Sequence, residues 1–70
     1  MNHANAITAV RTRIEQAMKS FAWRREAADA FEDMGDQRAA SSNRRIACYE
    51  LEHAAELLSI ENHLNGVSPE

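Results

Sequence analysis

The sequence has few of the residues that interrupt or cross-link a chain. Its seventy residues include two glycines, one proline and a single cysteine, Cys48. One cysteine excludes an internal disulfide framework and is typical of a reducing compartment. The sequence also lacks a long uncharged apolar run, and its first residues do not form the apolar core of a secretion signal. We therefore expect a cytoplasmic protein that does not associate with a membrane.

Basic residues are absent from the last third of the chain. The sequence has eight Lys and Arg against eleven Asp and Glu, a formal net charge of −3, and no base follows Arg45. This acidic balance does not favour nucleic-acid binding, which usually depends on basic surfaces. Seventy residues form one small domain with a marginal core, so we expect oligomerisation to contribute to stability.

Two helical segments are separated by Gly35. We predict one domain over residues 1–70, with a first helix at about 5–34, a second at about 36–65 and a tail at 66–70. Gly35 fits the position after a helix end, where a left-handed residue is needed, and Asp36 can cap the second helix. The run from Ser41 to Asn43 has weak helix propensity, which leaves a later start of the second helix open.

The short turn predicts an all-α antiparallel hairpin. Apolar residues of the second segment form two neighbouring arcs at about 100° per residue. The first arc contains Ile46, Tyr49, Leu57, Ile60 and Leu64, and the second contains Ala47, Leu51, Ala54 and Leu58. One partner helix covers only one arc. We therefore predict that the hairpin dimerises into a four-helix bundle, or assembles into a higher homo-oligomer.

Glu50 and His53 form an E-x-x-H pair in a part of the second helix that should be buried. Glu50 projects between the two arcs, and His53 lies within the first. A buried carboxylate is costly unless it is paired, protonated or bound to a metal. Glu and His at i and i+3 on an inward face are also the ligand pair of di-iron helical bundles. Antiparallel pairing places Glu15 near the same level, so a two-fold dimer would gather two copies of all three residues around two iron or manganese ions.

The segment that contains this pair, residues 46–58, resembles the second helix of ferritin-like di-iron proteins. It is most similar to the two-helix encapsulated ferritins, in which a dimer interface completes the metal site. Trp23 and residues 28–30 resemble the first helix of that group, and the whole resemblance extends over about residues 14–58.

The resemblance implies that Glu50 and His53 are metal ligands and that a glutamate of the first helix bridges the ions. It also implies iron binding and ferroxidase activity. The bridging glutamate of the family would fall near Ala17, about half a turn from Glu15.

Non-metal interpretations remain open. Glu50 could pair with an arginine and leave His53 as a partly buried imidazole. Four arginines and an indole lie near one level of the hairpin and could hold a phosphate, a nucleotide or an acidic partner segment. These are Arg24, Arg25, Arg44, Arg45 and Trp23. The same arginines could simply form ion pairs with Glu26, Asp29 and Glu50. The alternative function is a non-enzymatic interaction protein, and nucleotide or nucleic-acid binding is a third reading.

Overall fold

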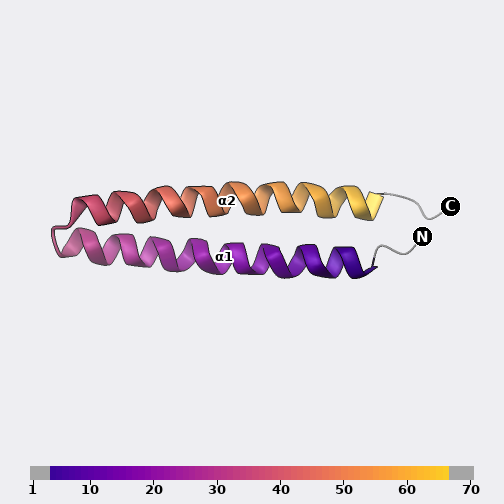
Figure 1. The fold of residues 1–70 in the computed structure, drawn as a ribbon, viewed down its shortest axis with the longest axis horizontal. Coiled ribbons are helices and arrows are strands. Elements are labelled where there is room, and N and C mark those ends of the chain that lie inside the picture. Colours follow the sequence, from indigo (N-terminus) through magenta and orange to yellow (C-terminus); the bar gives the residue numbers. More distant parts are fainter. Residues whose placement is uncertain (1–3, 67–70) are drawn as a thin grey trace.

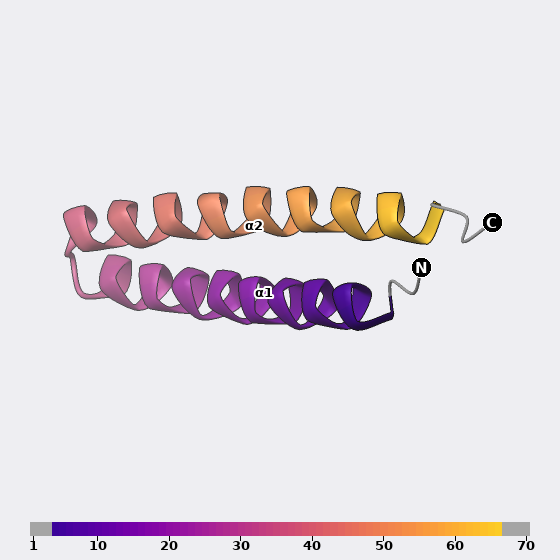
Figure 2. The same cartoon turned by 45° about the vertical axis from the view of Figure 1, so that its right-hand side comes forward.

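The protein is an antiparallel pair of long helices in the computed structural model, which describes residues 4–66. Helix α1 spans Ala4–Asp33 and α2 spans Gln37–Gly66. The two helices lie side by side and are joined by a short turn at one end (Figure 1, Figure 2). The predicted all-α hairpin is confirmed, and each helix begins and ends within one residue of its predicted bounds. Most of the predicted tail, residues 67–70, lies outside the described residues.

The turn is formed by local backbone hydrogen bonds around Gly35. Gly35 has φ +82°, a left-handed conformation that costs a glycine little. The Asp36 amide donates to the Phe31 carbonyl at 2.8 Å and the Gly35 amide donates to the Glu32 carbonyl at 2.9 Å, the bonding pattern of a Schellman motif. Asp36 Oδ1 accepts a hydrogen bond from the Ala39 amide at 3.1 Å. Gly35 and Asp36 therefore have the roles predicted from the sequence, and α2 starts before the Ser41–Asn43 run.

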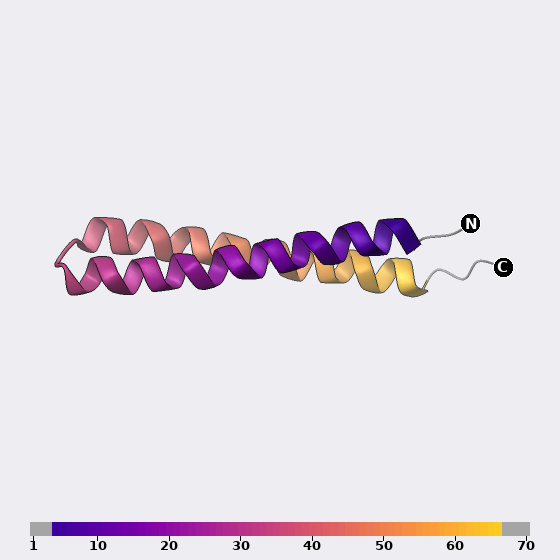
Figure 3. The ribbon, with the colours of Figure 1, turned by 90° about the horizontal axis from the view of Figure 1, so that it is seen from below.

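The contact between the helices follows a seven-residue repeat. The facing residues, which we call the seam, alternate at spacings of three and four, as in a coiled coil. All of them are buried or half-buried. In α1 they are Ile7, Val10, Ile14, Ala17, Phe21, Arg24, Ala28 and Phe31, and in α2 they are Ala40, Asn43, Ala47, Glu50, Ala54, Leu57, Glu61 and Leu64. Figure 3 shows that the helices cross along their length.

The core along this seam is thin because alanine occupies much of it. Ala40, Ala47 and Ala54 recur every seven residues and are 0–2% exposed. Leu57 is the only large apolar side chain in the buried class within residues 4–66.

This seam corrects the predicted division into two arcs. Ala47 and Ala54 of one arc share the seam with Leu57 of the other, while Leu51 and Leu58 are each 46% exposed. The arcs were assigned with 3.6 residues per turn, whereas the seam repeats every 3.5 residues. The seam therefore takes residues from both predicted arcs.

A polar pair interrupts the seam near the turn. Arg24 Nη1 donates a hydrogen bond to Asn43 Oδ1 at 3.0 Å, and Asn43 Nδ2 donates to the Ala39 carbonyl at 2.9 Å. The Arg24 guanidinium lies 4.2 Å from the centroid of the Trp23 ring. Its Nε atom is buried and has no hydrogen-bond partner. A single polar layer in a coiled coil fixes the register of the helices at a cost in stability.

We expect Asn43→Ala to destabilise the hairpin by about 1–3 kcal/mol, because Arg24 loses its acceptor while remaining half-buried. The double variant R24L/N43L should regain that loss or exceed wild-type stability, because two apolar residues replace an incompletely bonded polar layer. Urea unfolding followed by circular dichroism measures both effects. Equal midpoints for Asn43→Ala and the wild type would show that the pair contributes nothing.

Candidate functional site

Within residues 4–66, two shallow grooves lie on opposite sides of the seam. The first has a volume of about 540 Å³, and we call its side the histidine face. It is lined by Arg13, Gln16, Ala17, Ser20, Glu50 and His53. The second groove has a volume of about 310 Å³, and we call its side the arginine face. It is lined by Phe21, Arg25, Asp29, Arg44, Ala47 and Cys48. Residues one helical turn apart continue each face along the hairpin.

Glu50 and His53 line the same groove, although the predicted burial of the pair applies to Glu50 and not to His53. Glu50 holds a seam position and is half-buried, while His53 is exposed at the groove edge. The other seam carboxylate, Glu61, forms an ion pair with Arg11. Glu50 has no hydrogen bond or ion pair within the described part of the chain, and the seam residue beside it in the groove is Ala17. Within residues 4–66, Glu50 is therefore half-buried without an ion-pair partner, although Arg13 lines the same groove.

Glu15, the predicted bridging ligand, is not part of this groove. It is exposed and does not line the groove, whereas the next residue, Gln16, does. Successive helix residues point about 100° apart, so Glu15 lies on the far side of α1 from His53. Within residues 4–66, no three His, Cys, Asp or Glu side chains gather around a point that a metal ion could occupy. One chain therefore does not assemble the predicted ligand set, and completion by a second chain stays a prediction.

The four arginines predicted as a recognition surface are divided by the seam. Arg24 lies in the seam, and Arg25 and Arg44 line the groove of the arginine face. Arg45 is exposed and lines neither groove. Trp23 follows Ser20 by one turn, which places it on the histidine face. The indole and the arginine groove therefore lie on different sides of the hairpin.

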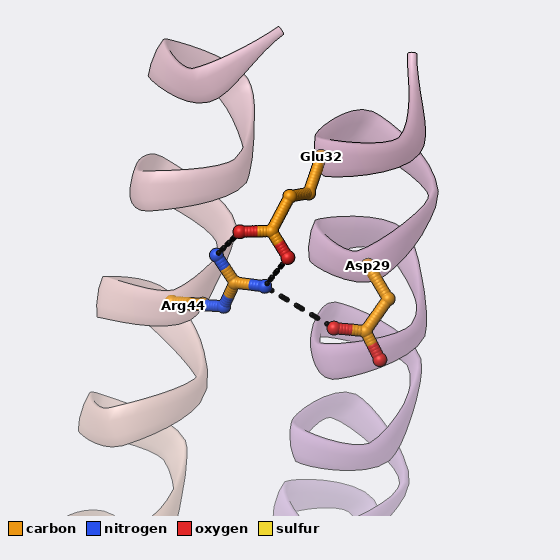
Figure 4. Close-up of polar contacts among 3 residues, drawn as sticks. All are labelled: Asp29, Glu32 and Arg44. Atoms are coloured by element: carbon orange, nitrogen blue, oxygen red, sulfur yellow. Dashed lines mark hydrogen bonds and ion pairs between the residues drawn. The ribbon is translucent and has the colours of Figure 1, made fainter. Parts of the chain in front are cut away.

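Arg44 bridges two acidic residues of α1 near the turn (Figure 4). Its Nη1 and Nη2 atoms donate to the two carboxylate oxygens of Glu32 at 3.3 and 3.0 Å, and Nη2 also donates to Asp29 at 3.2 Å. The hydrogen bond with Glu32 is the largest cause of a raised Arg44 pKa. Asp29 was among the partners predicted for the arginines, and Glu32 was missed. These groups are exposed, so the network stabilises the hairpin only weakly.

Arg25 differs from Arg44 because no carboxylate pairs with it among the described residues. Its guanidinium carbon lies 5.7 Å from the centroid of the Phe21 ring. Two of the acids predicted to pair with arginine, Glu26 and Glu50, make no ion pair within residues 4–66. Ion pairing therefore explains Arg44 but not the whole set.

No known protein family, curated protein or solved structure matches this chain. Within residues 4–66, neither helix combines the length and apolar character needed to cross a membrane. The chemistry of the two faces is therefore the basis for the functional proposal.

Proposed function

We propose that the protein binds a divalent transition-metal ion between two copies of the chain, with Glu50 and His53 of each copy as ligands. The observation that carries this proposal is the half-buried residue Glu50, which shares a groove with His53 and has no hydrogen-bond or ion-pair partner within residues 4–66. Two carboxylates and two imidazoles form a donor set that suits Fe(II), Mn(II), Co(II) or Zn(II). A bound cation would offset both glutamate charges.

The position of the pair along α2 supports a shared site. Helix α2 spans Gln37–Gly66, so Glu50 and His53 lie on either side of its midpoint. Two hairpins that overlap along their whole length therefore bring both pairs to the same level of a four-helix bundle. Such bundles build metal sites in this way, from side chains that project inward from facing helices.

The donor set fits one ion better than the di-iron centre implied by the resemblance. A di-iron centre uses bridging carboxylates from the other helices of the bundle. Here the first-helix residues in the groove are Gln16 and Ala17, and Glu15 lies outside it. We therefore propose metal binding, with iron or manganese as the leading candidates, and do not extend the proposal to ferroxidase activity.

Metal addition should raise the melting temperature of the wild-type protein. A ligand at one hundred times its Kd stabilises the native state by about 2.7 kcal/mol, which corresponds to a shift of roughly 10–20 °C for a domain of this size. His53→Ala and Glu50→Gln should abolish the shift with Fe(II), Mn(II), Co(II) and Zn(II). The matched controls His63→Ala and Glu52→Gln change exposed residues outside the groove and should retain it. A flat response to all four ions, or a shift that survives His53→Ala, would contradict the proposal.

A second candidate function is recognition of a protein partner by the histidine face. Trp23 is 54% exposed and Tyr49 is 60% exposed, and such aromatic side chains commonly supply binding energy at protein interfaces. We propose this interaction role as the alternative to metal binding. If this alternative is correct, Trp23→Ala should abolish partner binding in a pull-down from a cell extract, and the four metal ions should leave the melting temperature of the wild type unchanged.

A further inference from the structure

No charged residue occupies the positions of the histidine face over the half of the hairpin nearest the turn, and the one charge beside it there is the seam residue Arg24, whose guanidinium lies over the Trp23 ring. From the centre of each helix to the turn it presents small, aromatic and aliphatic residues at helical spacing. These residues are Ser20, Trp23, Ala27 and Ala30 of α1, and Ala39, Ser42, Ile46 and Tyr49 of α2. The arginine face at the same levels carries Arg25, Asp29, Glu32 and Arg44. Depletion of charged residues marks the centre of protein interfaces, so the two faces have different expected roles.

The hairpin leaves more surface exposed than a compact protein of the same mass does. The whole chain exposes 5301 Å². A folded monomer of 7.9 kDa is expected to expose about 4,400 Å². The difference of roughly 900 Å² follows from the thin core of a two-helix hairpin, which leaves a face along both helices open to a second copy.

We infer that the histidine face packs against the same face of a second copy, with the turns of both hairpins at the same end. This second copy is the one that completes the metal site of the proposed function. The contact between the two copies does not itself require a metal. In this orientation α1 of each copy lies against α2 of the other. Residues with the same number in the two copies lie at the same height along the bundle. Both Glu50–His53 pairs then lie within the contact.

Charge complementarity supports this orientation. Within residues 4–66, the open half of the histidine face carries two charged residues besides its histidines, Arg13 and Glu56. The Arg24–Asn43 contact fixes which residues of the two helices lie at the same height. Counting from it along both helices, Arg13 and Glu56 lie at nearly the same height, with an offset of about one residue on each helix. With the turns together, Arg13 of each copy meets Glu56 of the other. With the turns at opposite ends, Glu56 would instead be placed near Ile46 of the second copy, where it would bury a charge without a partner.

Side-chain size is also complementary in this orientation. The α1 side of the face is mostly small, whereas the α2 side carries Tyr49 and Ile60. Tyr49 lies at the level of Ser20 of the second copy, and Ile60 lies at the level of Ala9. Tyr49 and Ile60 therefore face small residues, which favours close packing, whereas Trp23 of one copy lies at the level of Ile46 of the other, so two large side chains share that layer.

Light scattering in buffer containing EDTA tests the contact independently of the metal. The wild type should have twice the 7.9 kDa mass of one chain. Tyr49→Glu should shift the protein to monomer, because it places a charge in the uncharged face. The matched variant Leu51→Glu changes a residue on the opposite face that is also partly exposed, at 46%, and should remain a dimer. A monomeric wild type, or dissociation by Leu51→Glu and not by Tyr49→Glu, would overturn the inference. A dimer that does not respond to metal would overturn only the proposed function.

The orientation is tested by a distance between spin labels at the two turns. Met34 is 74% exposed in the turn, so M34C in a C48S background carries one label per chain without disturbing the seam. With the turns together, the labels should lie within about 20 Å, because packed helices are separated by ~8–10 Å. With the turns at opposite ends, they would be separated by roughly the 45 Å length of a thirty-residue helix. A pulsed electron resonance distance near 45 Å, or no dipolar coupling at micromolar concentration, would overturn the inference.

Discussion

Ala54→Glu is expected to unfold the hairpin, whereas Ala55→Glu should leave it folded. Ala54 is 2% exposed and lies in the seam, and Ala55 is exposed. A glutamate at position 54 must either force the helices apart or bury an unpaired carboxylate, at a cost of about 3–5 kcal/mol. Net stabilities of small domains are of similar size, so this one substitution removes most of the folded population.

Ala55→Glu is the control for Ala54→Glu, because the two positions differ in burial. Both variants exchange the same residue types in the middle of α2, and glutamate forms helices nearly as well as alanine. Far-UV circular dichroism at 25 °C should therefore show strong helicity for Ala55→Glu and its loss for Ala54→Glu. Equal helicity and equal urea midpoints would mean that the alanine seam is not where the helices meet.

Leu57→Ala is expected to destabilise the protein by about 2–4 kcal/mol, because it empties the position of the only large apolar side chain in the buried class within residues 4–66. Leu57 is 5% exposed, and its neighbour Leu58 is 46% exposed. Leu58→Ala should therefore cost less than about 1 kcal/mol.

Thermal and urea unfolding of the two leucine variants gives the comparison directly. The same result separates the seam from the predicted arcs, since the arcs assigned Leu58 to a buried surface. A larger loss for Leu58→Ala than for Leu57→Ala would show that the second arc, and not the seam, is covered in solution.

The fold was predictable because its determinants are local. Gly35 ends one helix and Asp36 starts the next through hydrogen bonds that reach no further than five residues. The phase of the helix contact was less predictable, since a difference of a tenth of a residue per turn decides which apolar residues share the seam. The seven-residue spacing of Ala40, Ala47 and Ala54 was the signal from which the seam could have been predicted. The same spacing would have placed Asn43 in the seam as a polar residue.

The candidate site was predictable only in part. Glu50 and His53 share one helix, so their spacing alone places them on one groove. Glu15 belongs to the other helix, where matching its level to Glu50 does not fix the direction in which it points. The contact of Arg44 with Glu32 was missed for a related reason, because a long arginine side chain reaches acids that are not level with it.

Metal content is the most direct measurement of the proposed shared site. Protein prepared without a chelating tag, equilibrated with Mn(II) or with Fe(II) under anaerobic conditions and then passed through a desalting column, should retain one metal ion for every two chains by elemental analysis. Glu50→Gln and His53→Ala should each retain none, while His63→Ala retains the wild-type amount. Wild-type protein that holds no more metal than His53→Ala would contradict the assignment of Glu50 and His53 as a metal site.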